Sequence, residues 1–87
     1  MKVIIAYDVS SSRRRTKAAR LLADYGERIQ YSVFECDLSS DRLMALQQSL
    51  AALVNPRTDR VHIYPLCTAC FARAKAIGKQ YVGVPDW

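Results

Sequence analysis

Glycine and proline are scarce in this sequence, with three of each among 87 residues. Because linkers and disordered tails are usually rich in these residues, the scarcity argues against an unstructured chain. No repeat or linker divides the sequence, and its length suits one compact domain. Long apolar runs are also missing, since no stretch approaches the roughly 20 apolar residues of a membrane span. The apolar run near the first residue is too short for a signal peptide, so we expect a cytoplasmic protein with no membrane partner.

Basic and apolar residues, in contrast, are abundant. Thirteen Lys and Arg residues against eight Asp and Glu residues give a formal charge of +5. Such an excess favours polyanionic partners, nucleic acid first and an anionic membrane surface second, although a merely soluble basic protein would share it. The hydrophobic fraction of 51% is high for so small a domain. We therefore expect a second copy of the chain to cover an apolar face, forming a homodimer.

Apolar patterns in the first three quarters of the chain predict the order β-α-β-β-α-β. Residues 3–7 are typical of a central strand that is buried on both faces. An apolar stripe at residues 18, 21, 22 and 25 predicts a helix that ends with Gly26 in a left-handed conformation. Alternation over residues 27–38 changes phase near Tyr31, which predicts two strands joined by a tight connection. A second striped helix ends at Asn55-Pro56, and residues 61–66 read as a half-buried strand.

This order is that of an α+β, ferredoxin-like fold, in which two helices cover one face of a four-stranded antiparallel sheet. We expect residues 1–66 to form this core. Residues 67–87 would form a tail with a short helix over residues 69–77 and a strand over residues 81–84. A lone terminal strand needs a partner, and the sheet edge of a second chain would provide one.

Two segments resemble a known protein family. They are Ala6-Tyr7-Asp8-Val9, at the end of the first strand, and the run YGERIQYSVFEC at positions 25–36. Together with the strand at residues 63–66, they resemble Cas2, the small CRISPR-associated protein. The resemblance implies a homodimer that works beside the Cas1 integrase to acquire new spacers. It also implies binding of double-stranded DNA or single-stranded RNA, with endonuclease activity described for some family members.

The resemblance further implies roles for particular residues. The metal-binding aspartate of the family corresponds to Asp8, which becomes the candidate catalytic residue and ligand of Mg²⁺ or Mn²⁺. The functional arginines correspond to Arg15 and Arg28. The interface phenylalanine corresponds to Phe34, and Tyr7 would belong to the same dimer or core region. One carboxylate is too few for a good Mg²⁺ site, so a second Asp8 or phosphate oxygens would have to complete it.

Asp8 also has a structural interpretation, because a carboxylate there could accept hydrogen bonds from the first turn of the following helix. The single histidine, His62, lies mid-strand and far from Asp8 in the sequence. We expect it on the sheet surface rather than acting as a general base. No Ser/His/Asp set or glycine-rich phosphate loop is recognisable, so any hydrolysis would be slow and carried by the metal ion.

Five cations fall within eight residues at the start of the first helix, at Arg13, Arg14, Arg15, Lys17 and Arg20. Arg13, Lys17 and Arg20 share the solvent-facing side, whereas Arg14 and Arg15 lie near the apolar stripe in the first turn. No acid balances them, and cations at a helix N-terminus oppose the helix dipole. An anionic partner would relieve this, so these five and Arg28 are candidate nucleic-acid-binding residues. A solvated helix face is the alternative.

Cys67 and Cys70 have the spacing of metal ligands or of a redox pair. A zinc site needs four ligands, and only Cys36 and His62 remain as candidates. We therefore expect small, buried and reduced thiols.

Three other functions stay open. An RNA-recognition module shares the order of elements but needs exposed aromatic residues on its central strands. A ribonuclease toxin of the virulence-associated type shares the fold and could share the first-strand aspartate. A scaffold that binds DNA without cutting it is compatible with every residue named above.

Overall fold

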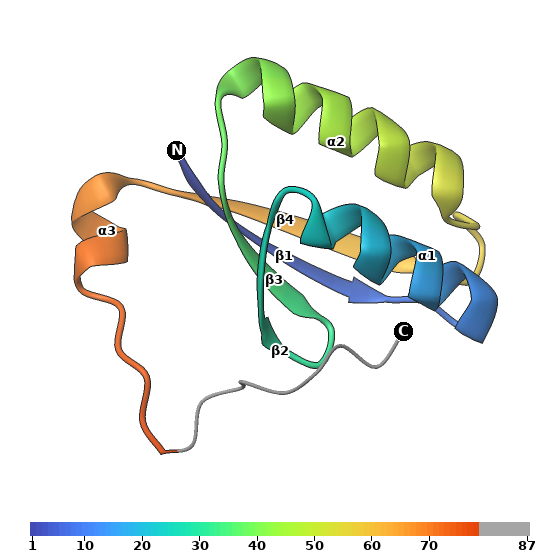
Figure 1. The fold of residues 1–87 in the computed structure, drawn as a ribbon, viewed down its shortest axis with the longest axis horizontal. Coiled ribbons are helices and arrows are strands. Elements are labelled where there is room, and N and C mark those ends of the chain that lie inside the picture. Colours follow the sequence, from blue (N-terminus) through green and yellow to red (C-terminus); the bar gives the residue numbers. More distant parts are fainter. Residues whose placement is uncertain (79–87) are drawn as a thin grey trace.

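The computed structural model describes residues 1–78. Its elements, in chain order, are β1 (Lys2–Asp8), α1 (Ser12–Ala23), β2 (Gly26–Gln30), β3 (Val33–Asp37), α2 (Ser40–Leu53), β4 (Arg60–Leu66) and α3 (Thr68–Ala72). The four strands form one antiparallel sheet in the order β2-β3-β1-β4. Figure 1 shows α1 and α2 on the same side of this sheet. The predicted ferredoxin-like α+β fold is therefore confirmed.

One face of the sheet forms the core with both helices. Alternate residues of β1 point to opposite faces, and its odd-numbered residues are the buried ones. The largest fully buried side chains, which come from β1, β3, α1 and α2, are Phe34, Ile5, Leu22, Leu46, Val3 and Cys36. Each such side chain contributes about 1.5–3 kcal/mol when it leaves water, so this layer is the main source of stability.

The opposite face of β1 is covered by neither α1 nor α2. Ile4 and Ala6 are half-buried on it, and Asp8 is exposed. Tyr64 of β4, which pairs with Ile4, leaves 50% of its surface exposed. The first strand is thus central as predicted, but in the part of the chain that the structure describes only one of its faces is fully buried. The prediction of burial on both faces is wrong for the isolated chain.

The hairpin between β2 and β3 confirms the predicted pair of strands. Tyr31 and Ser32 connect them, and the register shifts by one residue between Arg28 and Gln30. Ile29 is the additional residue, which forms a bulge opposite β3. The bulge and the short turn together account for the change of phase in the sequence pattern.

Gly26 has a different role from the predicted one. α1 ends at Ala23, and Gly26 does not have a positive φ angle. It begins β2 instead, tightly against β3. A Cβ atom at this position would overlap the backbone oxygen of Glu35 and come within 2.6 Å of the Cys36 sulfur. Close approach of two strands therefore explains the glycine, rather than a left-handed helix end.

The second helix follows the prediction, and the third does not. Ser39 caps α2, because its hydroxyl accepts a hydrogen bond from the amide of Arg42 at 3.2 Å. α3 is shorter than the predicted helix over residues 69–77, since it buries none of its residues and a short helix without packing is marginal. The Lys2 ammonium lies 4.7 Å above the centre of the Phe71 ring, which ties α3 to the start of β1.

The predicted strand over residues 81–84 and its pairing lie outside the described residues. Among residues 1–78, no helix has the length and apolar character that crossing a membrane requires.

Replacing Gly26 with alanine should destabilise the fold by roughly 2–3 kcal/mol, because the new methyl group would force β2 away from β3. The measurement is the free energy of unfolding from urea denaturation. Glu27→Ala, at the exposed neighbouring position, is the control and should change it by less than about 0.5 kcal/mol. Equal stability of Gly26→Ala and the parent protein would contradict the close-approach explanation.

Candidate nucleic-acid and metal site

Asp8 is the last residue of β1, and its side chain is exposed on the uncovered face of the sheet. Its partner across the antiparallel ladder is Arg60 of β4. The cap of α1 is Ser11, whose hydroxyl accepts a hydrogen bond from the Arg14 amide at 3.3 Å. The structural interpretation of Asp8 as the acceptor for the first turn of α1 is therefore wrong. Its carboxylate remains open to solvent and to a ligand.

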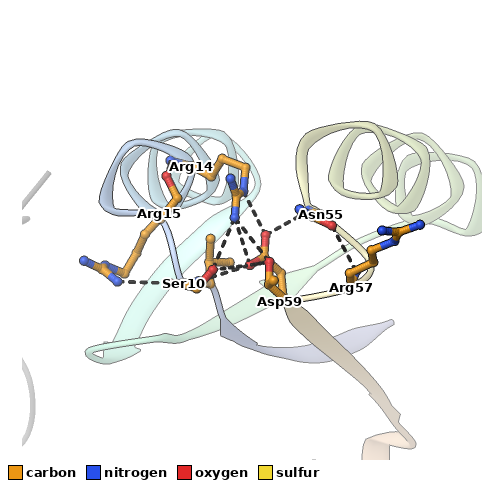
Figure 2. Close-up of polar contacts among 9 residues, drawn as sticks. Ser10, Arg14, Arg15, Asn55, Arg57 and Asp59 are labelled. Carbon is orange, nitrogen blue, oxygen red and sulfur yellow. Dashed lines mark hydrogen bonds and ion pairs between the residues drawn. The ribbon is translucent and has the colours of Figure 1, made fainter.

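A different acid, Asp59, holds this end of the molecule together from the loop before β4 (Figure 2). Its Oδ1 atom accepts hydrogen bonds from the amide and the hydroxyl of Ser10, both at 3.1 Å, and from Arg14 Nη2 at 3.1 Å. The hydroxyl of Thr58 donates to the same oxygen at 3.0 Å. Its Oδ2 atom accepts from Arg14 Nε at 2.9 Å and from the Asn55 amide at 2.8 Å. The Asp59 side chain is fully buried.

These donors stabilise the charged form of the carboxyl group. The Arg14 guanidinium makes the largest contribution, and with the amides of Asn55 and Ser10 it holds the pKa of Asp59 far below its ordinary value of 3.8. Burial acts in the opposite direction but is outweighed. The same pairing raises the pKa of Arg14. Ser10 closely follows Asp8 in the sequence, and Asp59 directly precedes Arg60, the cross-strand partner of Asp8. This network therefore fixes the edge of the sheet at which Asp8 lies.

The five cations of α1 divide into two groups. Arg13, Lys17 and Arg20 are exposed, and their spacing places them along one outer face of the helix. Arg14 is engaged by Asp59, and Arg15 donates from Nη1 to the backbone oxygen of Val9 at 3.0 Å. The structure thus brings three of the predicted residues to an open surface. It uses the other two to hold the loop that follows β1.

Arg28 lies apart from these cations, on β2. Its Nη2 atom donates to the Tyr7 hydroxyl at 3.4 Å, and its guanidinium carbon lies 5.4 Å from the centre of the Phe34 ring. The rings of Tyr7 and Phe34 stack with centroids 6.3 Å apart. Phe34 is only 1% exposed, so it belongs to the core and has almost no surface to offer a second chain. Phe34 is predicted to lie at the dimer contact or in the core, and a single chain shows it in the core.

The same burial bears on the RNA-recognition alternative. Such a module needs stacking aromatic residues exposed on its central strands. The aromatic residues of the two central strands, Tyr7 on β1 and Phe34 on β3, are buried beneath the helices instead. This alternative is therefore excluded for the sheet of this chain.

His62 is exposed on β4, as predicted for a histidine on the sheet surface. Its Nδ1 atom shares a hydrogen bond with the Tyr64 hydroxyl at 2.9 Å. His62 pairs with Ala6, and Arg60 pairs with Asp8, so His62 and Asp8 are diagonal neighbours on one face. Because His62 and Asp8 are far apart in the sequence, the sequence alone does not predict that they are neighbours. Among residues 1–78, no three His, Cys, Asp or Glu side chains gather to hold a metal ion, so the described part of one chain does not complete a metal site around Asp8.

The cysteines differ from the prediction of small buried thiols. Cys36 is buried in the core, and burial raises the pKa of its thiol. Cys67 and Cys70 are exposed. The prediction for this pair is wrong because α3 packs too little of its surface against the sheet to cover either sulfur.

Comparison with known proteins identifies the family. The family model "CRISPR associated protein Cas2" matches residues 1–74. The chain belongs to the Cas2 family. This membership confirms the resemblance read from positions 6–9 and 25–36, and it sets aside the ribonuclease toxin of the virulence-associated type.

Two curated Cas2 relatives show the extent of the likeness. A protein of Rhodospirillum rubrum named CRISPR-associated endoribonuclease Cas2 4 is 42% identical over 77 residues, covering 88% of this chain and 62% of that protein. A protein of Chloroflexus aurantiacus named CRISPR-associated endoribonuclease Cas2 1 is 43% identical over 79 residues, covering 90% of this chain and 85% of that protein. The chain therefore spans somewhat less than two thirds of the first relative and most of the second.

Solved structures agree with the Cas2 fold. The crystal structure of Streptococcus pyogenes Cas2 matches with a TM-score of 0.80 and 30% identity, over 90% of this chain and 100% of that one. A chain from a structure titled "Partial Cas6-RT-Cas1--Cas2 complex" matches with a TM-score of 0.75 and 27% identity, over 87% of this chain and 89% of that one.

Replacing Asp59 with asparagine should lower the melting temperature at neutral pH by roughly 10 °C, because Arg14 would lose its charged partner in a buried setting. The pKa of Asp59 is lower in the folded than in the unfolded protein. Its stabilisation is therefore complete above the ordinary value of 3.8 and is lost as the pH falls below it. The difference in melting temperature between Asp59→Asn and the parent should accordingly narrow in acid.

The melting temperatures are measured by circular dichroism during thermal unfolding at a series of pH values. Asp24→Asn, which changes an exposed carboxylate, is the matched control and should shift the melting temperature by no more than about 2 °C. A difference in melting temperature between Asp59→Asn and the parent that stays constant from neutral to strongly acidic pH would show that the ionised carboxylate is not the stabilising group.

Proposed function

We propose that this Cas2 chain acts as a homodimer that, together with a Cas1 integrase, captures and inserts new CRISPR spacers. The observation that carries the proposal is the placement of Asp8. It is an exposed carboxylate at the end of β1, close in sequence to a helix whose outer face carries three cations. Support comes from relatives named endoribonucleases and from the likeness to a chain of a Cas1–Cas2 complex.

Arg13, Lys17 and Arg20 are the proposed phosphate-binding surface, which we call the α1 face. No acid lies in the first turn of α1 to neutralise it. At a rise of about 1.5 Å per residue, the three side chains are spread over about 10 Å, so they would meet successive phosphates rather than one. Because none of the three is needed to hold the loop after β1, all are available to a nucleic-acid backbone.

The uncovered sheet face is the proposed contact between two copies. Ile4, Ala6 and Tyr64 give it an apolar centre that one chain leaves partly exposed. Asp8 and Arg60 stand opposite one another at its end. A two-fold axis through such a face would cover the apolar side chains. It would place the Asp8 carboxylate of each copy near the Arg60 guanidinium of the other copy. It would also bring the two Asp8 carboxylates towards each other.

A pair of Asp8 carboxylates fits a hard divalent cation, Mg²⁺ or Mn²⁺, which prefers oxygen ligands. The exposure of Asp8 suits this role, and phosphate oxygens and water would fill the positions that two carboxylates leave open. When bound, such an ion supplies an activated water and offsets charge on a phosphodiester. Asp8 would hold the ion, while the α1 face would hold flanking phosphates of DNA or RNA in position.

A scaffold that binds DNA without cutting it is the second candidate function. One observation favours it: among the described residues, the acids and the histidine do not form a cluster of three or more around Asp8. His62, its diagonal neighbour, already shares a hydrogen bond with Tyr64. In a scaffold, Asp8 would take part in the contact between the two copies rather than in cleavage of a phosphodiester.

Neutralising the α1 face should weaken duplex binding and reduce its salt dependence. Each phosphate contact contributes about 0.9 to the slope of log affinity against log salt, so Arg13→Ala, Lys17→Ala and Arg20→Ala together should lower the slope by up to about 3. Fluorescence anisotropy with a labelled duplex at several salt concentrations measures it. Arg57→Ala, an exposed arginine of the loop before β4, is the control and should leave the slope nearly unchanged. An unaltered slope in the triple variant would exclude the α1 face.

Asp8→Asn should lower metal-dependent cleavage of RNA or DNA at least about 100-fold, because the amide is a poor ligand for Mg²⁺. Asp24→Asn should cleave normally. Cleavage that survives in Asp8→Asn would place the activity elsewhere. Spacer integration with Cas1, measured on the same variants, separates the two functions. Integration without cleavage identifies the scaffold, and loss of both identifies the nuclease, provided that the variant still dimerises by light scattering.

A further inference from the structure

Cys67 and Cys70 lie where the chain leaves the sheet. Cys67 directly follows Leu66, the last residue of β4, and Cys70 lies within α3. Both thiols are exposed, whereas Cys36 is buried in the core. The pair takes no part in the α1 face or in the surroundings of Asp8, so the nucleic-acid function leaves it unexplained.

The two sulfur-bearing residues are in direct contact. The Cys70 amide donates a hydrogen bond to the Cys67 sulfur at 3.2 Å. The backbone oxygen of Cys67 accepts from the Phe71 amide at 2.9 Å, which closes a regular helical turn between the two cysteines. Residues three apart in such a turn have Cα atoms about 5–6 Å apart, which lies within the range that a disulfide spans. The backbone can therefore accommodate a bond between the two sulfurs without a large rearrangement.

The contact also makes the two thiols chemically unequal. Hydrogen bonds from the thiol and the amide of Cys70 lower the pKa of the Cys67 thiol. The pKa of the Cys70 thiol is raised, chiefly by its hydrogen bond to Cys67. Burial raises the pKa of Cys36 as well. Cys67 is thus the most readily ionised of the three, and a thiolate is the reactive form of cysteine.

We propose that Cys67 and Cys70 form a redox-active dithiol that is oxidised reversibly to a disulfide within one chain by small disulfides such as oxidised glutathione. The Cys67 thiolate attacks one sulfur of the small disulfide, whose S–S bond breaks and whose other half leaves as a thiolate that takes up a proton. Cys70 then loses its proton and attacks the Cys67 sulfur of the mixed disulfide. The Cys67–Cys70 bond forms and the second small thiol is released. The protein gives up two electrons and two protons in all.

A structural zinc site is the other chemistry that this spacing allows, and the structure weighs against it. Zinc needs four ligands in a structural site. Among residues 1–78, no group of three or more His, Cys, Asp or Glu side chains is placed to share a metal ion. Cys36, one of the two remaining candidates, is only 1% exposed within the core. The pair alone can exchange electrons but cannot complete a tetrahedral site.

The location gives the reaction a structural consequence. α3 begins between the two cysteines, and its Phe71 ring rests beneath the Lys2 ammonium of β1. A disulfide would fix the first turn of α3 and so set the direction in which the chain continues beyond the sheet. This inference does not rest on the proposed nucleic-acid function, and it can fail or succeed independently.

The test uses the full chain, equilibrated in buffers with different ratios of reduced to oxidised glutathione, trapped with N-ethylmaleimide under denaturing conditions and weighed intact. In reducing buffer all three cysteines should be alkylated. In oxidising buffer a species should appear that is lighter by two hydrogen atoms before alkylation and takes up maleimide at Cys36 alone. Cys67→Ser and Cys70→Ser should each abolish this species, and Cys36→Ser should retain it.

A rate measurement distinguishes a matched pair from two unrelated thiols. In the native protein, iodoacetamide should modify Cys67 at least about 10-fold faster than Cys36, and Cys70→Ala, which removes the donating thiol, should slow the modification of Cys67 several-fold. The proposal is overturned if every oxidised form is a glutathione adduct or a bond between chains. It is equally overturned if added Zn²⁺ protects both cysteines of the protein from alkylation at stoichiometric concentration.

Discussion

The Asp59 carboxylate accepts hydrogen bonds from two segments that are remote from it in the sequence and from its own loop, and the end of the sheet that carries Asp8 depends on them. They are the loop after β1, the first turn of α1 and the loop between α2 and β4. Because the side chain is buried and ionised, loss of any donor would leave part of a charge uncompensated away from water. The Arg14 guanidinium meets both oxygens of the carboxylate, a geometry that fixes direction as well as distance.

This arrangement divides α1 by function. Successive residues of a helix are rotated by about 100°, so Arg13 and Arg14 point in different directions although they are adjacent. Arg14 turns towards the loop that Asp59 organises, and Arg13 turns outward with Lys17 and Arg20. The uniform run of positive charge in the sequence is therefore two sets of side chains, one that stabilises the fold and one that is open to a partner. The uncovered face of the sheet is a third region, distinct from both.

The sequence predicted those features that depend on neighbours along the chain. A stripe marks the inner face of the second helix by its spacing alone, at Leu43, Leu46, Leu50, Leu53 and Val54. The first three are buried, and the last two are partly buried against the core. The link between Asp59 and Arg14 could not be found in this way, since 45 residues separate them. Nor does spacing report burial, so the prediction of buried thiols fails at Cys67 and Cys70, which are exposed. Gly26 shows the same limit, because the reason for it is a strand that follows later in the chain.

The outer side of α1 makes almost no contribution to the core, and this has an evolutionary consequence. Substitutions there change the electric field of the protein while leaving its folding free energy nearly untouched. Such a surface can drift rapidly, gaining or losing affinity for a given polyanion in single mutational steps. The helix beneath remains anchored by Leu22 on its inner side. One scaffold can in this way serve lineages whose partners differ, without passing through an unstable intermediate.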